Sequence, residues 1–123
     1  MTEIAPGWTA DAERSGDWLL VRLRVADSNL MDEPPLAERL WDLLQQHALQ
    51  QLVLELDQIQ VLRSYLVGQL VLLHKRAFVH GGQVRLCGLS PHNYEVIHVC
   101  RLADRFPAYR NRDEALRGVC APA

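Results

Sequence analysis

The segment Leu52-Val53-Leu54-Glu55-Leu56 decides the fold of this chain, because it is a short and nearly continuous apolar run. Such a run is typical of a central strand that is buried on both faces. Residues 64–79 follow with the spacing of a long helix, which Gly81-Gly82 ends as glycine commonly does. The apolar stripe of that helix consists of Leu66, Leu70, Leu73 and Ala77. Another apolar strand is predicted over residues 84–89, and the strand–helix–strand order predicts a right-handed crossover between parallel strands.

Two strands and a helix are predicted on the N-terminal side of this unit. Residues 8–14 alternate weakly between apolar and polar types, and residues 18–25 alternate clearly in their later half. Ser15-Gly16-Asp17 between them has turn chemistry, so an antiparallel hairpin is expected at one edge of the sheet. A helix is predicted from about Pro34-Pro35 to His47, because proline is tolerated in the first turn. The apolar stripe of this helix consists of Leu36, Leu40, Leu43 and Leu44.

The C-terminal third is predicted to add helices and one short extended piece. Ser90-Pro91 places a capping serine before a proline at the first helical position, and the helix should run towards Leu102. An extended piece near residues 106–109 and a last helix from about Arg112 to Arg117 complete the chain. The predicted fold class is α/β: a small mixed β-sheet, made of the N-terminal hairpin plus parallel strands, with about four helices packed on it. We expect one domain over residues 1–123, with its core in residues 8–118.

Composition excludes several classes of protein. The 123 residues are 49% hydrophobic, which disfavours disorder, and 13 basic against 15 acidic residues lack the positive excess of a nucleic-acid binder. Three cysteines without a CxxC pair favour a reducing compartment over a disulfide framework. No run approaches the roughly 18 apolar residues of a membrane-spanning helix, and the first residues lack the pattern of a secretory signal. A cytoplasmic domain that binds neither nucleic acid nor membrane is therefore expected.

The sequence shows no catalytic or metal-binding pattern. His74 and His80 are six residues apart, as are His92 and His98, and no cysteine stands at ligand spacing to any of them. Two of the cysteines, Cys87 and Cys100, are interpreted as small fillers of the core. Glu55 is the only carboxylate of the central strand, and a lone carboxylate cannot divide acid and base roles between two groups. We therefore predict a protein that is not an enzyme and uses no cofactor.

The order of these elements and the residues within them resemble the STAS family, which comprises the domains of anti-sigma factor antagonists and of the cytoplasmic ends of sulfate transporters. The resemblance runs from about Gly16 to Leu116 and implies a small mixed sheet with helices packed on it. Its most specific pieces are residues 52–56, 61–68, 72–76, 81–91 and 113–116. Each piece is weak alone, and their order and spacing make the resemblance specific.

The chain departs from the family at its phosphorylation motif. Switching members carry Asp-Ser-Ser-Gly at the start of the second helix, and the second serine receives the phosphate. The same positions here are Arg63-Ser64-Tyr65-Leu66, so that only Ser64 survives and Tyr65 stands at the acceptor position. In the loop after the second strand, the usual Gly-Glu-Leu-Asp is replaced by residues around Ala26-Asp27-Ser28-Asn29. The chain thus resembles a divergent branch that lacks the usual phosphoacceptor.

Three hypotheses of function follow from the resemblance and its departures. In the first, the chain docks onto an anti-sigma factor or a related regulatory ATPase, through Arg63, Ser64 and Tyr65 together with Asp27, Ser28 and Asn29. In the second, Ser64 is itself phosphorylated and the protein remains a switch, whereas a serine that merely caps the helix is the simpler interpretation. In the third, the chain is a structural subunit of a signalling assembly and self-associates through an apolar patch. Trp8, Trp18 and Trp41 are the candidates for such a patch, whereas burial in the core or packing of the N-terminus is the simpler interpretation of each.

Overall fold

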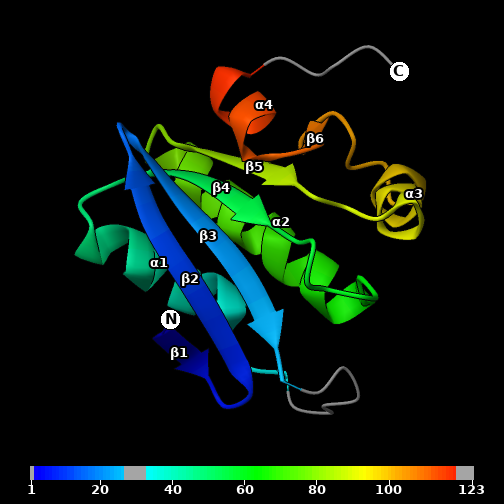
Figure 1. Ribbon diagram of the computed structural model, residues 1–123, viewed down its shortest axis with the longest axis horizontal. Coiled ribbons are helices and arrows are strands. Elements are labelled where there is room, and N and C mark those ends of the chain that lie inside the picture. The colour runs from blue at the N-terminus through cyan, green and yellow to red at the C-terminus, as the bar shows by residue number, and fades with distance from the viewer. Residues whose placement is uncertain (1, 27–32, 119–123) are drawn as a thin grey trace.

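A computed structural model describes residues 2–26 and 33–118 of the chain. These residues form a six-stranded sheet with helices on both faces (Figure 1), which confirms the predicted α/β class. The elements are β1 (Thr2–Ala5), β2 (Trp8–Ser15), β3 (Trp18–Val25), α1 (Leu36–Gln46), β4 (Gln51–Glu55), α2 (Ser64–Val79), β5 (Gln83–Cys87), α3 (Pro91–Val99), β6 (Ala108–Tyr109) and α4 (Arg112–Arg117).

The strands lie in the sheet in the order in which they occur in the chain, from β1 to β6. The first two pairings are antiparallel, and β3–β4, β4–β5 and β5–β6 are parallel. The β2–β3 hairpin turns at Gly16, whose φ of 58° lies in the left-handed region that glycine adopts without strain. In β4, Leu52, Val53 and Leu54 are each 0% exposed, which confirms a central strand buried on both faces.

Strand β1 is an element that the sequence analysis did not predict. Its four residues extend the antiparallel part of the sheet by one strand beyond the hairpin, and only Ala5 among them is buried. A strand this short has too few side chains to show a period of two residues. Backbone pairing with β2 therefore defines β1, and the hairpin lies one strand in from the edge.

Helices α1, α2 and α3 end in the same way, but only α2 ends with the glycine that predicts such an end from the sequence. A residue with positive φ follows each helix cap: Ala48 at 54°, Gly81 at 78° and Arg101 at 58°. The next residue then returns its N–H to a carbonyl of the last helical turn, as Leu102 does to Ile97 at 3.0 Å. Because Arg101 takes the place of the usual glycine, α3 ends at Val99, earlier than predicted.

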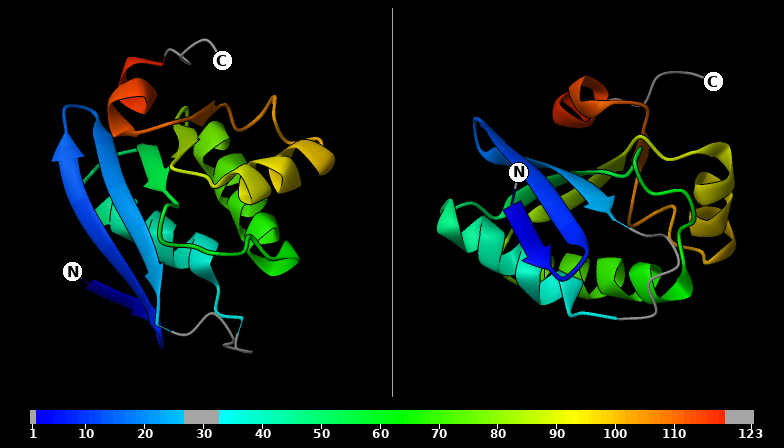
Figure 2. Two further views of the ribbon diagram at one scale, coloured as in Figure 1. Left: turned by 45° about the vertical axis from the view of Figure 1, so that its right-hand side comes forward. Right: turned by 60° about the horizontal axis from the view of Figure 1, so that its bottom comes forward.

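Two layers of helix cover the sheet. Figure 2 shows α1 and α2 side by side against one face, α4 on the opposite face, and α3 beyond the end of the sheet. The main core lies between the sheet and α1 and α2, and it contains Leu19, Leu23, Leu52, Leu54, Leu40, Leu44, Leu70 and Leu73. A smaller core lies under α4 and consists of Leu20, Val53, Cys87, Tyr109 and Ala115. Both faces of β4 are buried because each faces one of these two cores.

Candidate functional site

The start of α2 is presented by a loop that one buried side chain of α3 holds in place. Asn93 is 0% exposed, and its Oδ1 accepts a hydrogen bond from the backbone N–H of Leu62 at 2.9 Å. Its Nδ2 donates to the carbonyls of Ile59 at 3.0 Å and Gln60 at 3.3 Å. Ser90 caps α3 by accepting from the N–H of Asn93 at 3.1 Å, which places this amide at the helix start. The sequence analysis missed Asn93, although a polar residue among the first positions of a capped helix was a visible signal.

The loop that Asn93 holds buries two of its side chains and exposes the residues between and after them. Ile59 and Leu62 are buried in the main core, whereas Val61 between them is 53% exposed. Arg63 and Ser64 follow as exposed residues. The buried side chains of Ile59 and Leu62 and the hydrogen bonds of Asn93 therefore hold the loop in place, while Val61, Arg63 and Ser64 are exposed on it.

Ser64 does not cap α2, which corrects the simpler interpretation of this residue. The cap position belongs to Arg63, whose ψ of 158° is extended, and no side chain makes a cap hydrogen bond there. Ser64 is already the first helical residue, and the first turn closes through the Val67 N–H and the Arg63 carbonyl at 2.9 Å. A serine side chain can cap only from the non-helical position before the helix, which is one residue earlier.

Tyr65 faces the protein interior and not the outward surface of α2. Its half-buried ring packs against the main core, and its hydroxyl donates a hydrogen bond to the carbonyl of Pro34. Burial, together with the nearby negative charge of Glu33, raises the pKa of Tyr65 to about 12. The structure therefore separates Tyr65 from the exposed pair Arg63 and Ser64, whereas the sequence analysis placed all three on one face. The other expected binding residues, Asp27, Ser28 and Asn29, lie outside the described residues.

An exposed strip continues from Arg63 along α2. Ser64, Gly68 and Leu72 are spaced four residues apart, so they lie on one face of the helix, and Leu72 is 55% exposed. A Cβ built at Gly68 would meet nothing within 4 Å, so this face is open at its centre. We call Val61, Arg63, Ser64, Gly68 and Leu72 the α2 surface. The sequence analysis missed Val61, Gly68 and Leu72, although Leu72 lies visibly off the buried stripe of the helix.

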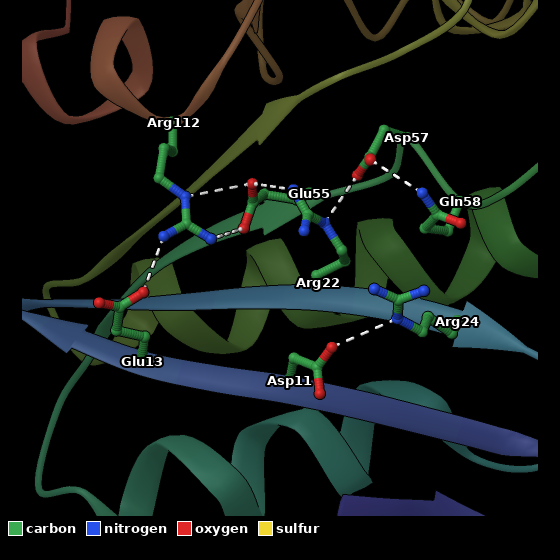
Figure 3. Close-up of polar contacts among 8 residues, drawn as sticks. All are labelled: Asp11, Glu13, Arg22, Arg24, Glu55, Asp57, Gln58 and Arg112. Atoms are coloured by element: carbon green, nitrogen blue, oxygen red, sulfur yellow. Dashed lines mark hydrogen bonds and ion pairs between the residues drawn. The ribbon is translucent and has the colours of Figure 1, made fainter. Parts of the chain in front are cut away.

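The opposite face of the sheet carries a chain of ion pairs centred on Glu55 (Figure 3). The Glu55 side chain is 6% exposed, and its carboxylate receives Arg112 Nη2 at 2.7 Å and Arg22 Nη2 at 3.2 Å. Arg112 also reaches Glu13 at 2.7 Å, and Arg22 reaches Asp57 at 3.1 Å. Hydrogen bonds to Glu55 and then to Glu13 raise the pKa of Arg112 above its usual range. The buried carboxylate is thus paired with two guanidinium groups, as a buried charge requires.

Helix α4 is held over the smaller core by this cluster and by Arg85. The Arg85 guanidinium lies 4.4 Å from the centre of the Trp18 ring and donates to the carbonyl of Ala115 at 2.6 Å. Arg112, at the start of α4, connects the helix to β4 through Glu55. The charged contacts therefore fix α4 in place and make a structural site of this face.

The cysteines provide no activated thiol among the described residues. Cys87 is buried in the smaller core as expected, and burial, followed by the charges of Glu55 and Asp57, raises the pKa of its thiol to about 12. Cys100 is exposed, so the expectation that it fills the core was wrong. It occupies the cap position after Val99, where α3 has already ended.

The remaining polar and aromatic candidates are dispersed. In the described part of the chain, no three His, Cys, Asp or Glu side chains come together to hold a metal ion. His74 is half-buried beside Phe106, and burial lowers its pKa, with a further contribution from Arg105. Trp8 and Trp41 are buried and Trp18 is half-buried, so no tryptophan provides the exposed patch considered for self-association. Across residues 2–26 and 33–118, no helix has the length and apolar character to cross a membrane.

The fold and the exposed helix start define a small α/β domain with a mixed sheet. A family model described as the STAS domain matches residues 11–115, and the chain belongs to this family. Among curated proteins, none matches the chain.

Solved structures support the same fold. An anti-sigma factor antagonist from Mycobacterium paratuberculosis is 23% identical, with 94% of this chain and 97% of that chain covered and a TM-score of 0.73. A STAS domain protein from Planctomyces limnophilus is 20% identical, with 89% and 96% covered and a TM-score of 0.73. The Bacillus cell fate determinant SpoIIAA in its phosphorylated form is 15% identical, with 89% and 98% covered and a TM-score of 0.63. The chain therefore belongs to the STAS family and shares the fold of these structures.

Proposed function

We propose that this chain is a non-enzymatic module that docks onto an anti-sigma factor or a related regulatory ATPase through the α2 surface. The observation that carries the proposal is the exposed strip that begins on the loop held by Asn93, with Val61 at 53% and Leu72 at 55% exposure on either side of Arg63 and Ser64. Family membership and the structural likeness to an anti-sigma factor antagonist support it. A partner of this kind would place the module in transcription control in a bacterial cytoplasm.

The chemistry of the α2 surface suits a protein partner. Two exposed aliphatic side chains supply apolar area that binding would remove from water, which stabilises a complex by about 25 cal/mol per Å². Arg63 supplies a guanidinium group for a carboxylate of the partner, and arginine is among the residues most enriched at binding hot spots. The open centre at Gly68 lets a partner approach the helix backbone.

The environment of the reactive groups supports the non-enzymatic part of the proposal. The Glu55 carboxylate is enclosed by two arginines, and the Cys87 thiol is held protonated by burial, with a pKa of about 12. The Cys87 thiol is therefore not available as a nucleophile at neutral pH, and the Glu55 carboxylate is occupied by its two arginines.

The same geometry favours a docking module without a switch at the usual position. Tyr65, which stands at the acceptor position in the resemblance, directs its hydroxyl to Pro34 and away from the α2 surface. A kinase bound at that surface would therefore not reach the hydroxyl.

A second candidate function, a switch at Ser64, rests on one observation. Ser64 is exposed at the first position of α2 and its side chain is not used as a cap, and a helix N-terminus favours a phosphate group. Incubation with a cognate kinase and ATP, followed by intact-mass measurement, tests it. A stable mass gain mapped to Ser64 would support the switch. The absence of a mass gain would count against the switch and would leave the docking module as the proposed function.

Affinity purification of the full chain from its native cell, with mass spectrometry of co-purifying proteins, tests the docking proposal. Recovery of an ATPase-type anti-sigma factor with the wild-type chain is expected. Arg63→Glu and Leu72→Ser should each reduce that recovery about tenfold or more, which corresponds to at least 1.4 kcal/mol of binding energy. Arg117→Glu makes the same charge change at an exposed residue of α4 and should leave recovery unchanged. Full recovery with both α2 variants would refute the α2 surface as the docking site.

A further inference from the structure

Two side chains of α2 bind the polypeptide at the start of α1. The Tyr65 hydroxyl donates to the carbonyl of Pro34, and Gln69 Oε1 accepts a hydrogen bond from the N–H of Ala37 at 2.9 Å. Tyr65 and Gln69 are four residues apart and therefore lie on the same face of α2. That face is turned toward α1, which packs beside α2 as Figure 2 shows.

Helix α1 has no capping side chain at its own start. Its cap position is Pro35, which makes no side-chain cap hydrogen bond. A capping side chain normally accepts from the N–H of the second or third helical residue. Ala37 is the second residue of α1. Gln69 of α2 therefore accepts the hydrogen bond that a capping side chain of α1 would otherwise accept.

We propose that Tyr65 and Gln69 are positioning residues that clamp the start of α1 onto α2. The clamp holds the chain at Pro34 and Ala37 beside the helix that begins with Ser64 and follows Arg63. In this respect the inference rests on the proposed function, because Arg63 and Ser64 belong to the α2 surface. The position that carries a phosphoacceptor in switching relatives thus holds a structural connection in this chain.

The environment of Tyr65 supports this role. Burial and the charge of Glu33 raise its pKa to about 12, so the phenol keeps the proton that it donates to Pro34 throughout the physiological range. A phosphate group on the same oxygen would remove that donor and would add negative charge beside Glu33. A folded chain should therefore resist phosphorylation at Tyr65.

Hydrogen–deuterium exchange of the isolated full chain tests the clamp without a partner. Tyr65→Phe keeps the ring and removes the hydroxyl, and Gln69→Met keeps the length of the side chain and removes the acceptor. Each should raise the exchange rate of the amides of residues 36–39 about fivefold, which is the effect of one hydrogen bond of ordinary net strength. The amides of β4 should not change. Tyr94→Phe, at an exposed tyrosine of α3, is the matched control and should leave residues 36–39 protected.

A rescue variant separates a specific clamp from general packing. Gln69→Glu restores an oxygen acceptor for the Ala37 N–H and should return the exchange of residues 36–39 to the wild-type rate. Unchanged exchange in both Tyr65→Phe and Gln69→Met would overturn the clamp, as would fast exchange in Gln69→Glu.

The clamp and the docking proposal fail in different experiments. Faster exchange in Tyr65→Phe with unaltered partner recovery in Arg63→Glu and Leu72→Ser would support the clamp and refute the docking surface. Unaltered exchange would overturn the clamp whatever the recovery shows.

Discussion

Replacement of Asn93 by leucine should destabilise the whole domain and release the loop before α2. Leucine has a similar volume but leaves the Leu62 N–H and the carbonyls of Ile59 and Gln60 without the amide that binds them. A buried polar group without a partner costs about 1–3 kcal/mol. Since a carbonyl tolerates this loss better than an N–H, we expect the free energy of unfolding to fall by about 2–4 kcal/mol.

Urea denaturation followed by circular dichroism measures this loss. With a slope of about 2 kcal/mol per molar urea, the middle of the range for small proteins, the midpoint should fall by about 1–2 M. Glu95→Gln, at an exposed residue of the same helix, is the control and should change stability by less than about 0.5 kcal/mol. The amide of Leu62 should also exchange faster in Asn93→Leu. A loss below about 0.5 kcal/mol with Leu62 still protected would refute the role assigned to Asn93.

Four further outcomes follow from the described contacts. Arg112→Met removes the contact between α4 and Glu55, so amides of residues 112–117 should exchange faster, and salt should reduce the difference from the wild type. In a chain with Cys120 replaced by serine, a thiol reagent at pH 8 should label the exposed Cys100 at once and Cys87 only when the chain unfolds. The reason is that burial raises the pKa of Cys87 to about 12. Immediate labelling of both cysteines would contradict this prediction. Gly68→Ala should stabilise the chain by about 0.5–1 kcal/mol, because alanine favours a helix and its Cβ meets nothing within 4 Å. Gly82→Ala should destabilise it in the same urea assay, because its Cβ would lie 1.9 Å from a backbone oxygen.

The order of the main elements was predictable because periodicity reports local burial. The continuous apolar run at residues 52–56 placed β4 at the centre of the sheet, and the stripes of α1 and α2 lie in the main core as expected. The Ser90-Pro91 cap also formed as predicted, since both of its partners lie within one helical turn. Elements without a period of their own, such as the four residues of β1, were not predictable in this way.

The candidate site was predictable only in part. The resemblance directed attention to residues 63–65, and the structure exposes Arg63 and Ser64 there. It turns Tyr65 inward because the helix rotates successive residues by about 100°, and the third position of the motif meets the start of α1. The sequence of a motif does not show which of its residues faces a neighbouring helix, because that depends on how the two helices pack.

The sequence by itself determined the α/β class and the buried central strand. Only the tertiary structure decided the partners of the buried polar groups, because those partners are distant in the chain. Glu55 meets Arg22 from 33 residues away and Arg112 from 57 residues away. Asn93 meets Leu62 across 31 residues. Apolar burial is non-directional and leaves a periodic trace along one element, whereas a hydrogen bond or an ion pair needs two specific groups that the complete fold brings together.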